Sequence, residues 1–400
     1  MDSKIMKTLF KNKLTIALLL SILLTSCTET YVLQTDTYEE ALVIEATITS
    51  ELKKQEIKLS KTAKLEDDGV AIETGATVSI KDDLGTLYIF KEDNGMYMSE
   101  NAFQALPERT YTLDIKTKDG KIYQSSGETV TTANEIEDIT SEVVTDRKEG
   151  RGVQIRVHSY DPGNTSKYYR YEYEETYKII APVYRQEKLV IIGPETIQLQ
   201  PNDPNTRICY TTKASNDIIL STTTDLQEDR VNFPVRFISD QNYIISHRYS
   251  IFVKQYVQNL ASYTFRKTMK EISSSASVLS PKQPGFVNGN IKCISHTDQK
   301  AIGFFEVSSV SSKRIFFNYK DLFPNEDLPP YYTECQEEEF KFCFGFSIPP
   351  CRGSILISRL KANALTYKYN IEATNYYMVP VECGDCTSFS SNVIPSFWTN

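Results

Sequence analysis

The sequence predicts a mainly β protein, in which an N-terminal immunoglobulin- or transthyretin-like β-sandwich precedes a larger β-rich domain with one prominent amphipathic helix. Three observations support this fold class. The 400 residues include 25 tyrosines and 19 phenylalanines beside many threonines, valines and isoleucines, which favour strands. Short runs of alternating polar and apolar residues are separated by glycine-containing turns. One segment stands out by carrying apolar residues at helical spacing.

Residues 1–26 have the pattern of a secretory signal peptide. A basic start precedes an apolar run from Leu14 to Leu24, and these 11 residues are too few to cross a bilayer as a helix, which takes roughly 20. The run fits the apolar region of a signal, typically about 7–15 residues long. A membrane anchor or a buried helix is the alternative. The basic residues are Lys4, Lys7, Lys11 and Lys13.

Cleavage is expected before Cys27, because Leu24-Thr25-Ser26-Cys27 resembles the lipobox of bacterial lipoproteins. The resemblance implies that the Cys27 thiol is lipidated and that residues 27–41 tether the protein to a membrane. Two or more acyl chains anchor a protein stably, whereas one binds only marginally. The alternative is an ordinary cysteine beside a plain signal peptide.

The mature chain is acidic. Removal of residues 1–26 leaves 374 residues and takes away four lysines and one aspartate, so the formal charge changes from −8 to −11. Such a chain repels a phosphate backbone, which argues against nucleic acid as a partner. No later apolar stretch is long enough to span, so the predicted membrane contact is the lipid on Cys27.

Residues 42–132 are expected to form the β-sandwich. LVIEATIT alternates apolar and polar residues, as a half-buried strand does. Hairpin turns are predicted at Leu84-Gly85, Asn94-Gly95 and Asp119-Gly120. Leu106 and Tyr111 fit a tyrosine corner, in which the phenol bonds the backbone of a loop.

The remaining chain is divided at a charged segment without aromatic residues, 133–150, which is expected to be a connector or an edge segment. Residues 151–400 form the predicted second domain, with a long strand at KYYRYEYEETYKII that has one polar face. A helix is predicted near 255–274, packed on a sheet, and a cysteine-containing tail ends the chain. The helix has an apolar stripe of Val257, Ala261, Phe265, Met269 and Ile272.

Seven cysteines follow Cys27, an odd number, and export favours disulfides. CGDC at 383–386 is compatible with a redox dithiol, half a zinc site or a disulfide staple. A redox pair normally begins a helix, but TSFSSNVIPSFW follows here, so structural disulfides are expected. Connectivity cannot be derived from the sequence. The candidates are Cys335, Cys343, Cys351, Cys383 and Cys386.

Catalytic signatures are mostly missing. The three histidines have no metal-ligand spacing, and the sequence has no nucleophile elbow, phosphate loop or HExxH motif. We therefore predict no enzyme activity, no catalytic residues, no metal site and no cofactor. Glu337–Glu339 lies in a stretch rich in proline and tyrosine, which is either a solvated loop or a rim that meets a partner.

Segments spread in order over nearly all of the mature chain carry a family resemblance: Cys27 with Tyr31, LVIEATITSELKKQEIKLSKT, ATVSIKDDLGTLYIF, GMYMS, RTYTLDIKTKDGKIYQSS, RICYTT, PGFVNGNI, IGFFEVSSVSSKRIFF and the terminal CGDC…PSFW. In these segments the chain resembles the Bacteroidota outer-membrane lipoproteins that share domain of unknown function 4249. Ala46 replaces a glycine that is usual in that family, and residues 390–394 lack the family's glycines and basic residue. The resemblance implies an outer-membrane location and genes commonly found beside TonB-dependent receptors.

The leading functional hypothesis is a lipid-anchored, non-catalytic binding or accessory component of a TonB-dependent nutrient-uptake system, in contact with a TonB-dependent receptor. An adhesin or structural envelope lipoprotein is the second hypothesis. An envelope hydrolase is the third, and it requires two opposed carboxylates about 5–10 Å apart. The tail is expected to be pinned back onto the second domain.

Overall fold

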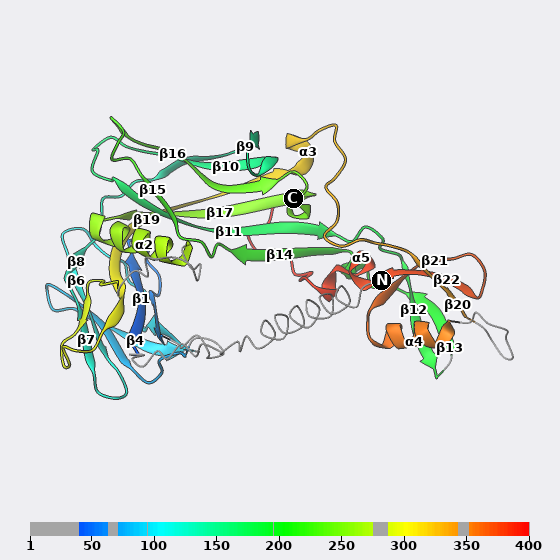
Figure 1. Cartoon of the computed structure of the whole chain (residues 1–400), viewed down its shortest axis with the longest axis horizontal. Helices are drawn as coiled ribbons and strands as arrows, with labels where there is room; N and C mark the ends of the chain where they lie inside the picture. The colour runs from blue at the N-terminus through cyan, green and yellow to red at the C-terminus, as the bar shows by residue number, and fades with distance from the viewer. Residues whose placement is uncertain are drawn as a thin grey trace, which may run out of the picture. The chain divides into compact units, whose positions relative to one another are not determined.

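The chain forms the predicted mainly β fold (Figure 1). The computed structural model describes residues 40–62, 71–93, 95–194, 196–274, 287–342 and 352–399. Cys27, Cys343 and Cys351 therefore lie outside the described residues, together with the expected signal peptide.

The strands of the N-terminal part curl around one core. Every strand except the short β8 contributes buried side chains to the same apolar cluster, so one face of each strand points inward. The strands are β1 (Leu42–Thr49), β2 (Glu56–Lys61), β3 (Thr77–Asp82), β4 (Leu87–Asp93), β5 (Met96–Ser99), β6 (Thr110–Lys116), β7 (Ile122–Ser125), β8 (Glu128–Thr129) and β18 (Ile291–Cys293).

The predicted hairpin turns are confirmed. Gly85, Gly95 and Gly120 have φ values of 85°, 79° and 89°, a region that glycine adopts without strain. They connect β3 to β4, β4 to β5 and β6 to β7, and each pair is antiparallel. The tyrosine corner is also confirmed, because the buried Tyr111 hydroxyl accepts a hydrogen bond from the backbone N–H of Leu106 at 2.9 Å.

A second core lies between two sheets. A three-stranded sheet, ordered β16-β10-β9, shares one buried apolar cluster with the strands β14, β11, β17 and the end of β19. The strands are β9 (Ile136–Asp146), β10 (Gly150–Asp161), β11 (Tyr168–Ile180), β14 (Ile208–Ala214), β15 (Ile219–Thr222), β16 (Asp229–Ser239), β17 (Arg248–Gln258) and β19 (Ala301–Asn318). The segment 133–150 thus contains the edge strand β9 rather than a free connector.

The long strand β19 joins the two parts. Its first half pairs in parallel with β1, Leu42 opposite Ala301, and its second half pairs antiparallel with β17. The result is one sheet of 14 strands, ordered β14-β11-β17-β19-β1-β2-β5-β4-β3-β6-β7-β18 with β15 and β8 beside this path. The predicted bounds of the second domain, 151–400, are therefore corrected, because β18 and half of β19 complete the N-terminal core. The cause is a long-range parallel pairing, which local patterning cannot reveal.

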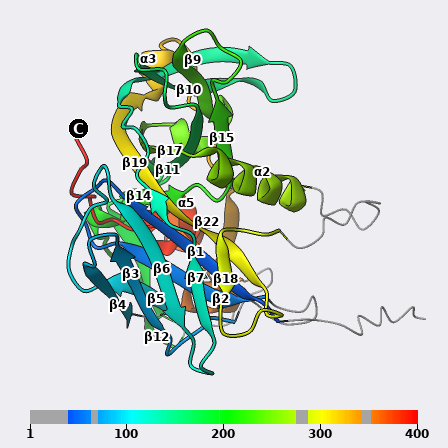
Figure 2. The ribbon, with the colours of Figure 1, turned by 90° about the vertical axis from the view of Figure 1, so that its left-hand side faces the viewer.

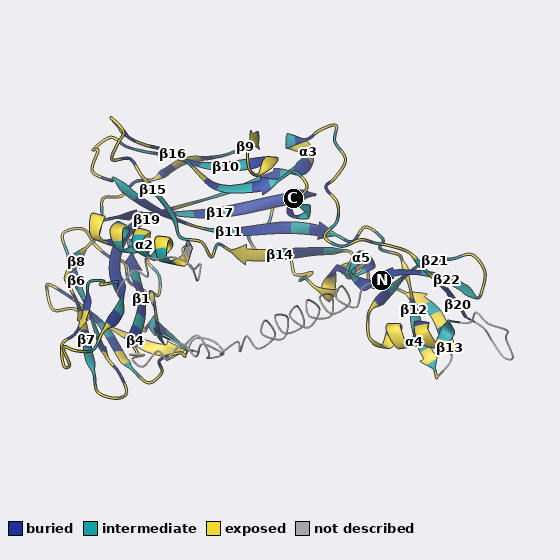
Figure 3. Ribbon diagram, in the orientation of Figure 1, coloured by how far each residue is buried: buried dark blue, intermediate teal, exposed yellow. Residues whose placement is uncertain are grey.

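The predicted amphipathic helix exists but begins later than its apolar stripe. Asn259 accepts a hydrogen bond from the backbone N–H of Ser262 at 2.8 Å and so caps the helix α2 (Leu260–Ser274). Val257 belongs to β17, and Ala261 is exposed. The helix contacts β11 and β19 and exposes its outer side (Figures 2 and 3).

A small C-terminal lobe has its own apolar cluster. It contains a hairpin of two strands and a three-stranded sheet ordered β20-β22-β21, with α4 packed on them. The elements are β12 (Glu187–Gly193), β13 (Thr196–Pro201), β20 (Glu338–Lys341), α4 (Gly353–Lys361), β21 (Leu365–Asn370) and β22 (Asn375–Pro380). The short helices are α3 (Tyr319–Leu322), α5 (Val381–Gly384), η1 (Pro204–Thr206), η2 (Tyr243–Ile245) and η3 (Cys386–Ser388). In the described part of the chain, no helix has the length and apolar character needed to cross a bilayer.

Candidate functional site

Charged side chains alternate along one face of β11, as the sequence predicts for this strand. Tyr169, Tyr171 and Tyr177 point to the opposite face and fill the second core. The polar face is not open to water throughout, because Arg170 is only 5 % exposed beneath α2. A charge that is this well buried needs specific partners.

The partners form an ionic network around Glu306 of β19, which is 2 % exposed. Glu306 lies 2.9 Å from Nε of Arg266 on α2 and 3.5 Å from a guanidinium nitrogen of Arg170. Its carboxylate also accepts hydrogen bonds from the Ser262 and Ser308 hydroxyls at 2.8 and 2.5 Å. Glu306 thus connects β11, β19 and α2.

The surroundings favour the charged forms of Glu306 and Arg170. Burial raises the pKa of Glu306, but the charges of Arg170 and Arg266 and the two serine hydroxyls outweigh this effect. The pKa of Glu306 is therefore well below its usual range. Burial lowers the pKa of Arg170, and the charges of Glu306 and Glu172 more than restore it. The Arg170 guanidinium also lies 3.8 Å from the ring centre of Tyr256, whose hydroxyl donates to Glu172 at 2.8 Å.

A groove with a volume of about 560 Å³ adjoins this network. Its floor comes from β1 and β19, whose alternation puts Val43 and Thr47 beside Ile302 and Glu306 in the parallel register. Its wall comes from α2, and the Arg266 guanidinium, which lines the groove, also reaches Thr47 at 3.4 Å. The other apolar lining side chains are Met96, Ile218, Phe265, Met269 and Phe304.

The groove combines an apolar wall with a few fixed polar groups. Glu45 pairs with Lys58 at 3.1 Å on the rim, while Glu56 and Glu172 add carboxylates to the lining. Size, apolar lining and adjacent groups with perturbed pKa values are the usual marks of a binding site. The lining suits a ligand with an apolar body and a polar end that accepts or donates hydrogen bonds.

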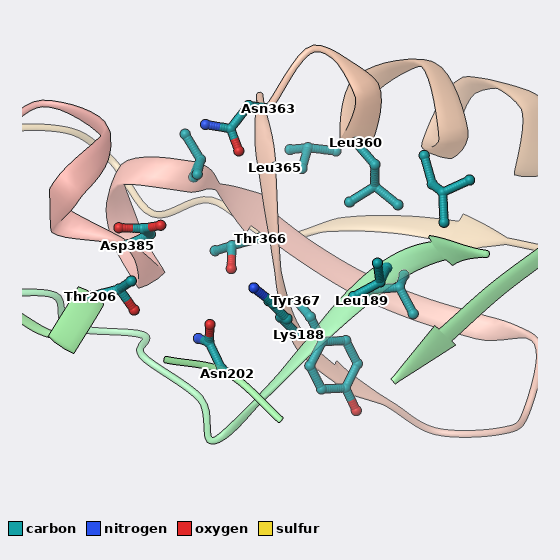
Figure 4. A pocket seen from close by; sticks show the side chains of 13 residues that line it. Lys188, Leu189, Asn202, Thr206, Leu360, Asn363, Leu365, Thr366, Tyr367 and Asp385 are labelled. Carbon is teal, nitrogen blue, oxygen red and sulfur yellow. The ribbon is translucent and has the colours of Figure 1, made fainter. Parts of the chain in front are cut away.

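A smaller pocket of about 370 Å³ lies in the C-terminal lobe (Figure 4). Leucines of α4 and β21 form its apolar side, and Asp385 of the CGDC motif is at one end. Asp385 already caps η3 by accepting hydrogen bonds from the N–H and hydroxyl of Thr387 at 2.8 and 2.5 Å. We therefore regard the groove as the stronger candidate. The polar groups around the pocket are Lys188, Asn202, Thr206, Asn363, Thr366 and Asp385.

The cysteines of CGDC form disulfides with two different partners. Cys383 is bonded to Cys335, as expected for two of the candidates, and Cys386 is bonded to Cys209, a cysteine outside the predicted set. Gly384 between them is required by close packing, because a Cβ at this position would lie 2.6 Å from the Thr366 methyl carbon. Each residue of the motif therefore has a structural role.

The tail is pinned back onto the second part, as predicted. The Trp398 ring lies 5.0 Å from Tyr210 and 5.7 Å from Phe316, between ring centres. The Arg314 guanidinium lies 3.5 Å from the ring centre of Phe397. Tyr210, Phe316 and Arg314 lie on the face of the sheet that also carries Glu174. The tail therefore covers part of this face.

The sequence-predicted residues are thus only partly near the groove. Met269 and Phe265 of the predicted helix line it, whereas the disulfides lie in and beside the C-terminal lobe. Glu306 and Arg266 were missed, although a single glutamate inside the apolar run IGFFEVSS was a usable signal. Among the described residues, no group of three or more His, Cys, Asp or Glu side chains is placed to hold a metal ion.

The fold and the groove define a cysteine-bridged, mainly β protein with an ionic network beneath a single packed helix. Within that class, the chain belongs to the family described as domain of unknown function (DUF4249), whose profile matches residues 28–314. The family prediction is thereby confirmed, and the CGDC tail lies beyond the matched residues. Association with TonB-dependent receptors stays a prediction.

Comparisons with other proteins add little. No curated protein matches the chain. One similar solved structure is a DUF4785 family protein from Legionella pneumophila, with 8 % identity and a TM-score of 0.17 over 53 % of this chain and 50 % of that chain. The chain spans about half the length of that protein, and a likeness this low supports no argument about function.

Proposed function

We propose that this protein is a lipid-anchored outer-membrane lipoprotein that binds its ligand without catalysis, as an accessory component of a TonB-dependent nutrient-uptake system. The observation that carries the proposal is the groove beneath α2, whose polar groups are held in place by the buried Glu306 network. Fixed polar groups beside an apolar wall favour recognition, because little ordering is needed when a ligand binds.

Other features support an exported, anchored protein. The lipobox-like Leu24-Thr25-Ser26-Cys27 follows a signal-like segment. The two disulfides in the described residues are the kind of cross-link that persists in an oxidising compartment. Family membership brings the expectation of a transporter partner.

Ligand binding is tested by filling the groove. Met269 lines the groove, so Met269→Trp is expected to remove a co-purifying ligand that native mass spectrometry detects on the wild-type chain. Leu226→Trp is the matched control, because Leu226 is 52 % exposed and does not line the groove. Equal ligand occupancy in both variants would contradict binding in the groove.

The accessory role is tested separately by cross-linking in living cells and purification after solubilisation. We expect a large outer-membrane barrel protein to co-purify with the wild-type chain, and Cys27→Ser to lose it together with the membrane fraction. A cross-linked wild-type sample without a barrel partner would contradict this role. Surface display of the anchored protein without any transporter would instead indicate an adhesin or a structural lipoprotein.

A further inference from the structure

A second concave site lies at the far end of the same sheet face, away from α2. It has a volume of about 460 Å³ and is formed by β11, β17, the end of β19, α3 and Leu328. The site lies on the same face of the sheet as the groove, because Lys178, like Arg170, Glu172 and Glu174, is at an even position of β11. The polar residues that line it are Lys178, Ser246, His247, Arg248, Asn318 and Lys320.

The lining of this basic pocket carries positive charge. It is lined by two lysines, an arginine and a histidine, and by no aspartate or glutamate among the described residues. Two acidic residues adjoin the lining: Asp321 accepts two hydrogen bonds from Asn318 at 2.9 Å, and Glu326 pairs with Arg151 while its backbone carbonyl accepts a hydrogen bond from the Lys320 ammonium. A concentration of positive charge is unexpected in a chain with a formal charge of −8.

Among the described residues, the hydrogen-bond partners of Arg248 are neutral groups. Its two terminal nitrogens donate to the Asn318 side-chain oxygen and to the Thr399 hydroxyl, both at 3.2 Å. Its guanidinium lies 4.9 Å from the ring centre of Phe316, and its buried Nε has no partner in the described structure. Among the described residues the Arg248 guanidinium has no carboxylate partner, so an anion in the pocket would supply a counter-charge and charge-assisted hydrogen bonds.

His247 adds a group that responds to charge. Burial, and next the charge of Lys178, lower the pKa of His247 below its usual value. The charged groups around it are Lys178 on β11, Arg248 on β17 and Lys320 on α3. Tyr319 and Asp321, also on α3, are the neighbouring titratable groups, and the Tyr319 N–H donates to the His247 carbonyl at 3.0 Å.

We propose that this basic pocket binds an oxyanion, a phosphate or carboxylate group, through Lys178, Arg248 and Lys320. Arg248 supplies a planar pair of donors, whereas the lysines supply flexible point charges from two other elements. The site is separate from the groove and does not depend on the proposed uptake function. A bound anion is expected to raise the pKa of His247.

The position of the tail provides a direct readout. Trp398 is the single tryptophan of the chain, and its neighbour Thr399 bonds Arg248. We expect inorganic phosphate, added to the full detergent-solubilised chain at constant ionic strength, to change the tryptophan fluorescence in a saturable manner. In the Lys178→Gln/Lys320→Gln variant the affinity should fall at least tenfold, which corresponds to about 1.4 kcal/mol.

The control variant Lys213→Gln/Lys292→Gln removes the same charge from exposed positions that do not line the basic pocket. It should bind phosphate like the wild type. Equal affinity in the two double variants, or no saturable response of the wild type, would overturn the proposal. A second readout is the NMR titration of the three histidines, in which only His247 should shift to a higher pKa with phosphate.

Vesicles distinguish the source of the anion. Displacement of phosphate by vesicles of phosphatidylglycerol, but not of phosphatidylcholine, would identify a lipid headgroup as the ligand. Retention of phosphate in the presence of both vesicles would identify a soluble anion. Either outcome supports an oxyanion site, provided that phosphate binding is weakened in the Lys178→Gln/Lys320→Gln variant.

Discussion

Removing the two disulfides one at a time should destabilise the protein to different extents. Cys209 and Cys386 are 177 residues apart, and Cys335 and Cys383 are 48 apart. If each cross-link acts by restricting the unfolded chain, the longer loop contributes about 5 kcal/mol and the shorter about 4 kcal/mol. Cys209→Ser/Cys386→Ser should therefore lower the free energy of unfolding by about 1 kcal/mol more than Cys335→Ser/Cys383→Ser.

The assay is urea unfolding without reductant, followed by the fluorescence of Trp398, which packs on Tyr210 next to Cys209. Replacing both partners avoids a free thiol that could exchange with the remaining disulfide. Cys293→Ser is the control, because Cys293 is buried and is a free cysteine. It should change stability by about 1 kcal/mol, the usual size of a single buried substitution.

Peptide mapping under non-reducing conditions can refute the reasoning. We expect one cross-linked peptide pair for Cys209 with Cys386 and another for Cys335 with Cys383. A bond between Cys383 and Cys386, or both as free thiols in the native protein, would show that CGDC is not a structural double staple. Equal stability of both double variants and the wild type would exclude the loop-closure argument.

Four further changes test the ionic network, the N-terminal sandwich, the turn after β10 and the CGDC turn. Glu306→Gln should lower stability by about 3–5 kcal/mol in urea unfolding, because it removes the buried counter-charge that Arg170 and Arg266 share. Tyr111→Phe should cost about 1 kcal/mol in the same assay, the net value of its hydrogen bond. Burial raises the pKa of Asp161, but hydrogen bonds from three backbone N–H groups lower it from 3.8 to about 2, so its stabilisation is present above pH 3.8 and is lost toward pH 2. Asp161→Asn should therefore cost about 2 kcal/mol at pH 7 and much less near pH 2, as measured by unfolding at each pH. Gly384→Ala should cost about 1–3 kcal/mol, and Thr366→Ser should restore much of it by removing the clashing methyl group.

Controls separate these effects from general loss of charge or size. Glu174→Gln removes a partly exposed ion pair with Arg314 and should cost about 1 kcal/mol or less. Tyr332→Phe changes a side chain in a residue that is 40 % exposed and should be nearly neutral. A loss for Glu306→Gln no larger than for Glu174→Gln would contradict the buried network. The same loss for Asp161→Asn at pH 7 and near pH 2 would contradict the low pKa of Asp161.

Local features of this chain were predictable from its sequence. The turns at Gly85, Gly95 and Gly120 require backbone conformations that glycine adopts, and the strands alternate because one face is buried. Tyr111 was found through its spacing from Leu106, since a tyrosine corner is a short-range arrangement. The absence of a helical pattern after CGDC correctly favoured disulfides over redox chemistry.

The candidate site depends on contacts that are remote in the sequence. Arg170, Arg266 and Glu306 come from three elements, and they meet because β19 pairs with β1 on one side and with β17 on the other. The predicted start of the helix was too early for a different, local reason: Val257 continues the helical spacing but belongs to β17, and Asn259 caps the helix after that strand.

The sequence alone determined the fold class, the turns, the export and lipidation hypothesis and the structural role of CGDC, because these depend on composition and short spacings. Tertiary structure decided that Cys209 is the partner of Cys386, that β19 joins both parts, and that a groove and a basic pocket lie on one sheet face. Those features require residues more than 100 positions apart to meet, as Cys209 and Cys386 do over 177 residues, and no local pattern encodes such a pairing.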